Sequence, residues 1–479
     1  MRVIEQEKSS QPTQKQASKI NLANIIKAKS FIKAENTISA KDENFLQTLL
    51  ENDTANYNPP IEEARLNMIR DDLTRNYSEQ VLQALTDDEI RQKLVDVVLK
   101  EHGSLFNKEK SREVAEYVVR ECIGTGIIER IMTNDEITDV GWNGSQLSVE
   151  TNNNKWLIDG EKLNITPEYI ERVISKYAVV NDRDFNSGNP IMDGMFKNVR
   201  ISATHIDNSP DGATMSMRVA RPKLALNTNN FQDFAPNYIL ELFEKMVKTK
   251  ANICISGETG TGKTELQKLL LSFIDNHDRM IMIEDVQETH AKELFPDKDI
   301  YAWITTPKKT ISDLVKACLR NNPRWIIVSE TRGAEAYEML QAILSGHHVI
   351  TTLHAINARA IPRRFVNMCA SGYNINETAV EEDINRYFDF GVHIKKVVIN
   401  NKVIRYLNEI VEFSADGATT VFKQKFINGN FVRENGTLSD DFKERMAEKF
   451  ITFEFPEGKD VDSEATELDC ENSEVEVIS

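Results

Sequence analysis

The octapeptide GETGTGKT at residues 257–264 is the feature that most constrains the fold of this chain. The apolar run NICIS precedes it as a strand, and ELQKLLLSFI follows it as a helix. The octapeptide fits the phosphate-loop pattern G-x-x-x-x-G-K-[ST], whose glycines turn backbone N–H groups toward phosphate at a helix N-terminus. All of its residues are therefore predicted to contact a nucleotide: Gly257, Glu258, Thr259, Gly260, Thr261, Gly262, Lys263 and Thr264.

Two side chains of this loop have specific expected roles. Lys263 is predicted to reach the β and γ phosphates of ATP, and the Thr264 hydroxyl to coordinate Mg²⁺. The predicted cofactors are therefore ATP and Mg²⁺. A triphosphatase also needs carboxylates at the ends of neighbouring strands, to hold Mg²⁺ through water and to orient the attacking water.

Two apolar runs end in such carboxylates. MIMIEDVQE offers Glu284, Asp285 and Glu288, and WIIVSE ends in Glu330. Acidic residues at strand ends also serve as helix caps, so that alternative stays open for each residue taken alone. The upstream phosphate loop favours Glu330 as a site residue, with Asp285 and Glu330 holding Mg²⁺ through water.

The order of apolar patterns predicts the domain organisation. Residues 1–58 are a flexible polar leader, 59–131 repeat apolar residues at helical spacing, and 132–226 alternate as short strands of a mixed α+β domain. A polar linker is expected at 227–236. Strand-like and helical runs then alternate over 237–455, which predicts an α/β domain with a largely parallel sheet.

Composition excludes several classes of protein. No segment approaches the ~18 apolar residues of a spanning helix, and the N-terminus is too polar for a secretory signal, so a cytosolic location is expected. Five scattered cysteines argue against a disulfide framework and a zinc cluster. The net charge is −17, and residues 457–479 contribute nine acids against one lysine. Direct nucleic-acid binding is therefore disfavoured, and 456–479 is expected to be an acidic disordered tail.

The stretch SGHHVITTLHA, residues 345–355, contains three histidines. Alternation along a strand puts His348 and His354 on one face and His347 on the other, which disfavours a zinc site built from all three. A purely structural histidine is the alternative for His347 and His348. For His354, at the strand end, phosphate sensing is the leading interpretation.

Four segments in this order, GETGTGKT, MIMIEDVQET, RNNPRWIIVSETRGAEAYEMLQAILSGH and TTLHA, resemble the Walker A, acidic, Walker B and His boxes of the type II and type IV secretion ATPases. Upstream, NDEITDVGWNG, NPIMDGMFKNVRISA and MSMRVARP resemble the N-terminal domain of that family's conjugative and tight-adherence pilus branches. The sequence departs from the pattern at Ser329, where glycine is usual, and in a His box that is one residue shorter than usual.

The resemblance implies a RecA-like ATPase domain behind an α+β N-terminal domain and a helical segment. It further implies a homo-hexameric ring that hydrolyses ATP for a type IV secretion, conjugation or pilus assembly machine, with inner-membrane partners and peripheral contact at the cytoplasmic face of the membrane. Implied site residues are grouped by role: Lys263, Glu284 and Glu330 in catalysis, with Arg200, Arg218, His354 and His347 at the nucleotide.

Several alternatives stay open at this stage. Arg200 and Arg218 could simply be surface arginines on sheet edges. Arg332 matches the family's glutamate-x-arginine-glycine pattern, or forms an ion pair behind the site. A nucleic-acid translocating motor and a nucleotide-binding scaffold with little hydrolysis are the competing functions.

Overall fold

The computed structural model describes residues 59–152, 154–306, 308–399 and 402–456, so the predicted leader and nearly all of the predicted tail lie outside it. By contacts the chain divides at residue 57, and all described residues belong to the second unit. No helix among the described residues is long and apolar enough to cross a membrane.

The predicted helical segment forms five helices: α3 (Glu63–Asn76), α4 (Ser78–Gln83), α5 (Asp88–His102), α6 (Ser111–Cys122) and α7 (Ile127–Thr133). Helix α5 begins where the Asp87 side chain accepts hydrogen bonds from two backbone N–H groups of its first turn. Apolar residues at three- and four-residue spacing pack inward, among them Ile69, Val98 and Val118.

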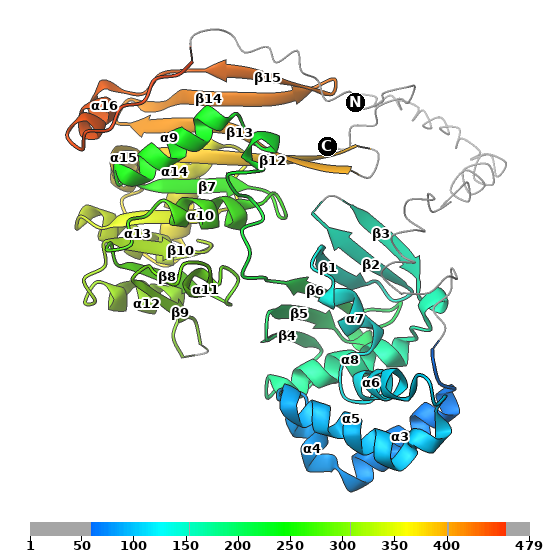
Figure 1. Cartoon of the computed structure of the whole chain (residues 1–479). Coiled ribbons are helices and arrows are strands. Elements are labelled where there is room, and N and C mark those ends of the chain that lie inside the picture. Colours follow the sequence, from blue (N-terminus) through cyan, green and yellow to red (C-terminus); the bar gives the residue numbers. More distant parts are fainter. Residues whose placement is uncertain (1–58, 153, 307, 400–401, 457–479) are drawn as a thin grey trace, which may run out of the picture. The chain divides into compact units, whose positions relative to one another are not determined.

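The mixed domain contains one antiparallel sheet in the order β3-β2-β1-β6-β5-β4, with α8 beside it (Figure 1). Its elements are β1 (Ile137–Trp142), β2 (Gln146–Thr151), β3 (Lys155–Asp159), α8 (Pro167–Val180), β4 (Ile191–Phe196), β5 (Val199–Thr204) and β6 (Thr214–Val219). Short 3₁₀ turns lie at η1 (Gly103–Leu105), η2 (Gly160–Leu163) and η3 (Ile206–Asn208).

The predicted linker is partly core. Its Asn227–Asn230 stretch is polar, but Phe231 in the turn η4 (Phe231–Asp233) is fully buried and Phe234 nearly so. Both phenylalanines pack in the apolar cluster around α9 (Asn237–Lys248). The low apolar content of the segment did not indicate this burial, because only two large aromatic side chains among its ten residues account for it.

The C-terminal domain is built on a nine-stranded sheet in the order β15-β14-β13-β12-β7-β11-β10-β8-β9. The strands from β12 to β9 are parallel, and β12 to β15 pair antiparallel. The strands are β7 (Ile253–Gly257), β8 (Met280–Glu284), β9 (Ile300–Ile304), β10 (Trp325–Val328), β11 (His348–Leu353), β12 (Phe390–Ile399), β13 (Lys402–Ser414), β14 (Gly417–Ile427) and β15 (Asn430–Asn435).

Helices cover both faces of this sheet, which is why its central strands β7, β8, β10 and β11 are buried at nearly every position. Ile327 packs in the cluster that includes α9, and its neighbours Ile326 and Val328 pack in the cluster on the other face. The remaining helices are α10 (Lys263–Ser272), α11 (Ala291–Leu294), α12 (Ile311–Cys318), α13 (Glu335–Leu344), α14 (Ile361–Ala370), α15 (Glu377–Tyr387) and α16 (Asp440–Ala447), with a 3₁₀ turn at η5 (Ala358–Ala360).

Candidate functional site

The site is built at the carboxyl ends of parallel strands β7, β8, β10 and β11. In open α/β sheets, loops at this edge carry ligand-binding residues. GETGTGKT forms the turn from β7 into α10, as its sequence context predicted. Gly262 is the N-cap of α10 with a φ of +96°, a conformation that favours glycine. At Gly257 a Cβ would lie 2.7 Å from the carbonyl oxygen of Ile394, so the loop depends on glycine there too.

Lys263 lies within this loop rather than in solvent. Its Nζ donates to the carbonyl oxygens of Gly257 and Glu258, each at 3.0 Å. Burial lowers the pKa of Lys263 to about 8, although the nearby Glu330 carboxylate acts in the opposite direction. The ammonium group is thus held among backbone groups of the loop, where a phosphate would also be bound.

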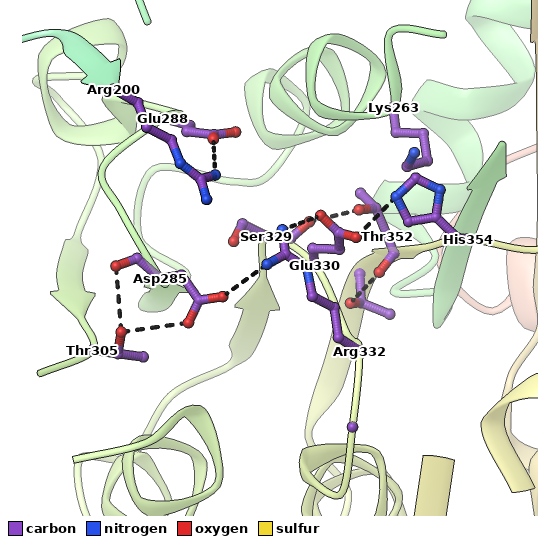
Figure 2. Close-up of polar contacts among 12 residues, drawn as sticks. Arg200, Lys263, Asp285, Glu288, Thr305, Ser329, Glu330, Arg332, Thr352 and His354 are labelled. Atoms are coloured by element: carbon purple, nitrogen blue, oxygen red, sulfur yellow. Dashed lines mark hydrogen bonds and ion pairs between the residues drawn. The ribbon is translucent and has the colours of Figure 1, made fainter. Parts of the chain in front are cut away.

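Glu330 follows the end of β10 and lies between two basic side chains (Figure 2). Its Oε2 accepts a hydrogen bond from Nη2 of Arg332 at 2.7 Å, and its Oε1 lies 3.1 Å from Nε2 of His354. Burial raises the pKa of Glu330, but the hydrogen bond and charge of Arg332, with His354 and Lys263, outweigh it and leave the pKa below its ordinary value. The carboxylate is therefore ionised at neutral pH and aimed at the loop side of the sheet.

Arg332 connects the two acidic strand ends. Beside its contact with Glu330, its Nη1 lies 3.5 Å from Oδ2 of Asp285. Asp285 in turn lies 3.4 Å from the Thr305 hydroxyl. Arg332 thus forms ion pairs with both Glu330 and Asp285. An ion pair was one of the two alternatives for Arg332 that the sequence left open.

Glu284 and Asp285 are neighbours in sequence but differ in environment. The Glu284 side chain is only 2% exposed, and it accepts hydrogen bonds from Thr289 N, Thr289 Oγ1 and Glu288 N at 2.8 to 3.1 Å. Burial raises the pKa of Glu284. Its oxygens are used to fold the loop after β8, so the geometry supports a positioning role rather than the predicted catalytic one.

The histidines of SGHHVITTLHA lie at opposite ends of β11. His354 follows the strand and reaches Glu330, whereas His348 begins the strand against the Trp325 ring. The Nδ1 atom of His347 lies 3.1 Å from the Ser345 hydroxyl and 3.3 Å from the carbonyl oxygen of Ala342. The structure does not bring His347 to the loop, so its predicted contact with nucleotide gains no support within one chain. Strand parity concerns only the faces of a strand, so it did not indicate which end of β11 carries the site.

The two predicted arginines are cross-strand neighbours. Arg200 on β5 pairs directly with Arg218 on β6. Arg218 Nε lies 2.8 Å from Oδ1 of Asp139, and Arg200 Nη1 lies 3.4 Å from Oε1 of Glu288. Two like charges directly opposite in a sheet repel each other, so each arginine is balanced by a carboxylate.

The donor chemistry fits a nucleotide with Mg²⁺. The Thr264 hydroxyl and the Asp285 and Glu330 carboxylates are oxygen donors, the type that Mg²⁺ prefers. The glycine-dependent loop offers backbone N–H groups for phosphate at the start of α10. The three histidines do not form a zinc site, because His354 follows β11 at one end while His347 and His348 lie at the other. Among the described residues, the group of side chains that could hold a metal ion is Asp72, Glu101 and His102.

Fold and site together define a RecA-like phosphate-loop protein with a preceding α+β domain. Residues 171–382 match the family model described as type II/IV secretion system protein. An uncharacterized protein of Bacillus anthracis is 46% identical over 408 residues, which cover 82% of this chain and 92% of that protein. The chain belongs to the type II/IV secretion ATPase family.

Two further relatives have informative names. A putative conjugal transfer protein of Mycobacterium tuberculosis is 26% identical over 276 residues, covering 53% of this chain and 75% of that protein. The type IV secretion system protein VirB11 of Brucella suis is 34% identical over 126 residues, covering 24% of this chain and 34% of that protein.

Proposed function

We propose that this protein is a Mg²⁺-dependent ATP hydrolase that works as a homo-hexameric ring and powers a type IV secretion, conjugative transfer or pilus assembly machine. The observation that carries the proposal is the Glu330 carboxylate at the end of β10, held by Arg332 and His354 and close enough to Lys263 to affect its pKa. A carboxylate kept ionised beside a phosphate loop is the group that orients water for attack on a γ phosphate.

The proposed roles follow from the environment of each side chain. Lys263 would exchange its loop carbonyl partners for phosphate oxygens, and its charge would offset the negative charge that develops on them. Glu330 would accept a hydrogen bond from the attacking water and hold it in line with the γ phosphorus. Mg²⁺, held by Thr264 directly and by Asp285 and Glu330 through water, would neutralise charge on the β and γ phosphates.

Arg332 and His354 would respond to the nucleotide through Glu330. Both side chains contact the Glu330 carboxylate. When Glu330 binds the attacking water or Mg²⁺, its contacts with Arg332 and His354 would change. Arg200 and Arg218 would reach the γ phosphate by leaving Glu288 and Asp139. A phosphate between these two like-charged neighbours would relieve their repulsion, and a guanidinium can bind it with two hydrogen bonds.

The machine is inferred from the relatives. The names of the Mycobacterium and Brucella proteins refer to conjugal transfer and type IV secretion. We extend this to inner-membrane partners and to a cytoplasmic location with peripheral contact at the membrane. ATP-driven motion of one domain against the other would then act on those partners.

The test is phosphate release by the full chain at high protein concentration with Mg²⁺. Wild-type protein should hydrolyse ATP, and Lys263→Ala and Glu330→Gln should each remove the activity while the fold, followed by circular dichroism, stays intact. A chain that binds ATP but releases no phosphate would instead be a nucleotide-binding scaffold. Turnover that requires single-stranded DNA would favour the translocating motor.

A further inference from the structure

The sheet face formed by β12, β13 and β14 carries a groove that the nucleotide site does not use. Its volume is about 460 Å³, and its lining includes Lys395, Lys423, Lys425, Tyr406 and Phe426. Side chains alternate along β14, so Lys423 and Lys425 face the groove, and Phe422 packs in the apolar cluster on the opposite face.

The groove has an excess of positive charge. Lys395, Lys423 and Lys425 form no ion pair with any residue in the described part of the chain. The one acid in its lining, Glu409, is 4% exposed and accepts a hydrogen bond from the backbone N–H of Ala358 at 2.8 Å. A bound anion would therefore find three lysines without carboxylate partners.

The groove is also partly apolar. The Tyr406 and Phe426 rings pack around Phe431, with centroids 5.4 and 5.0 Å away. At the margins, Ile427 is 46% exposed and Ile356 is 82% exposed. A ligand that fits has negative charges interspersed with apolar side chains.

We propose that the acidic C-terminal segment of this chain, residues 457–479, binds in this groove of its own subunit. The segment has nine acidic residues and one lysine, and its last part, SEVEVIS, alternates glutamate with valine. In an extended chain this alternation puts carboxylates on one side and apolar groups on the other. That pattern matches a groove whose lining combines three lysines with Tyr406, Phe426 and two exposed isoleucines.

The segment can reach the groove. Phe455, near the last described residue, packs against Tyr238 at 6.2 Å, and Tyr238 packs against Phe422 at 6.3 Å, so Phe455 lies on the side of the sheet opposite the groove. The 23 residues of the segment span up to about 75 Å when extended, several times what is needed to pass one sheet edge.

A nucleic acid suits the groove less well than this segment does. The segment is attached to the chain, so its effective concentration at the groove is high without any outside partner. Exposed isoleucines beside the lysines also favour a peptide with apolar side chains.

The test uses the full chain with a fluorescent dye on Cys470, inside the segment, in a Cys122→Ser background. The other described cysteines, Cys254, Cys318 and Cys369, are buried and not competing sites. Lys423→Glu/Lys425→Glu should lower the fluorescence anisotropy of the dye, as should about 0.5 M NaCl, because salt screens the attraction. Lys108→Glu/Lys110→Glu, the same charge change on two exposed lysines outside the groove, should leave it unchanged.

A charge swap makes the result specific. Adding Glu474→Lys/Glu476→Lys to Lys423→Glu/Lys425→Glu should restore the anisotropy, because opposite charges face each other again. Equal anisotropy in wild-type protein and the groove variant would overturn the proposal. So would single-stranded DNA that binds wild-type protein but not the groove variant while the dye on Cys470 does not respond. That result would assign the groove to nucleic acid.

Discussion

The Nε2 atom of His354 lies 3.1 Å from Oε1 of Glu330, which joins the end of β11 to the end of β10 at the phosphate loop. Arg332 holds the other carboxylate oxygen at 2.7 Å. The orientation of Glu330 is thus fixed by two side chains that come from different segments. This arrangement leads to distinct expectations for the residues around it.

We predict that Glu330→Gln removes hydrolysis but keeps nucleotide binding. The amide has the shape of the carboxylate but cannot accept a proton or orient water as strongly, so turnover should fall about 10²–10⁴-fold. Phosphate release measures turnover, and thermal stabilisation by Mg-ATP measures binding. Glu116→Gln on α6 is the matched control and should change neither. Full activity of Glu330→Gln would exclude Glu330 as the group that orients water.

We predict that alanine substitutions at His354 and His347 have different effects on ATP turnover. His354→Ala removes a contact to Glu330 and should lower turnover at least several-fold. His347→Ala affects a turn at the other end of β11 and should leave turnover of a single chain's site unchanged. Steady-state ATPase rates of the two variants decide this. A large loss in His347→Ala would mean that a neighbouring subunit brings His347 to the nucleotide.

Nucleotide affinity should weaken as the pH rises above about 8. Burial lowers the pKa of Lys263 to about 8, so above this pH the free protein holds a neutral amine. Bound phosphate favours the charged form and raises this pKa, so binding must take up a proton, and the dissociation constant should rise by up to about tenfold per pH unit. Titration with a fluorescent ATP analogue at pH 7 to 9.5 measures this. Lys263→Arg keeps its charge and should bind with little dependence on pH, and an equal slope in both proteins would contradict the assignment.

Glu284→Ala should act on stability first. The Glu284 carboxylate accepts three hydrogen bonds from the loop after β8, and removing it leaves the Thr289 hydroxyl and two backbone N–H groups without their partner. The free energy of unfolding should fall by about 2–3 kcal/mol, which urea denaturation measures. Asp285→Ala, at the more exposed neighbouring position, should cost less stability and more turnover. The reverse order would restore Glu284 as the catalytic acid of the pair.

The sequence predicted the phosphate loop, the acidic residues at the ends of two strands and the largely parallel sheet, because these depend on local patterns: glycine positions and the alternation of apolar runs. It could not distinguish Glu284 from Asp285, since their difference lies in the loop that folds back on one of them. It also assigned Phe231 and Phe234 to a linker, because their burial is set by packing against α9. The sequence also could not say whether His347 or His348 lies at the nucleotide site. Alternation predicts the face of a strand, but the end of the strand that carries the site depends on how the whole sheet is assembled.

His348 gives a test that is independent of nucleotide. It lies against the Trp325 ring, and burial, with the charges of Lys250 and Lys449, lowers its pKa to about 4. The unfolded chain protonates this histidine near its ordinary value of about 6.5, so between these values the unfolded state holds more protons. The contribution of His348 to stability is therefore complete above about pH 6.5 and is lost as the pH falls toward 4.

We predict that His348→Phe, which keeps an aromatic ring against Trp325, reduces the loss of stability between pH 6.5 and pH 4.5. Urea unfolding at the two pH values measures it in wild-type protein and in the variant. His277→Phe, at an exposed position, is the matched control and should retain the wild-type dependence on pH. His393, also buried with a pKa lowered to about 4, should account for part of the dependence that remains. An unchanged dependence in His348→Phe would mean that His348 is protonated in the folded protein, and that its contact with Trp325 is one of a cation with a ring.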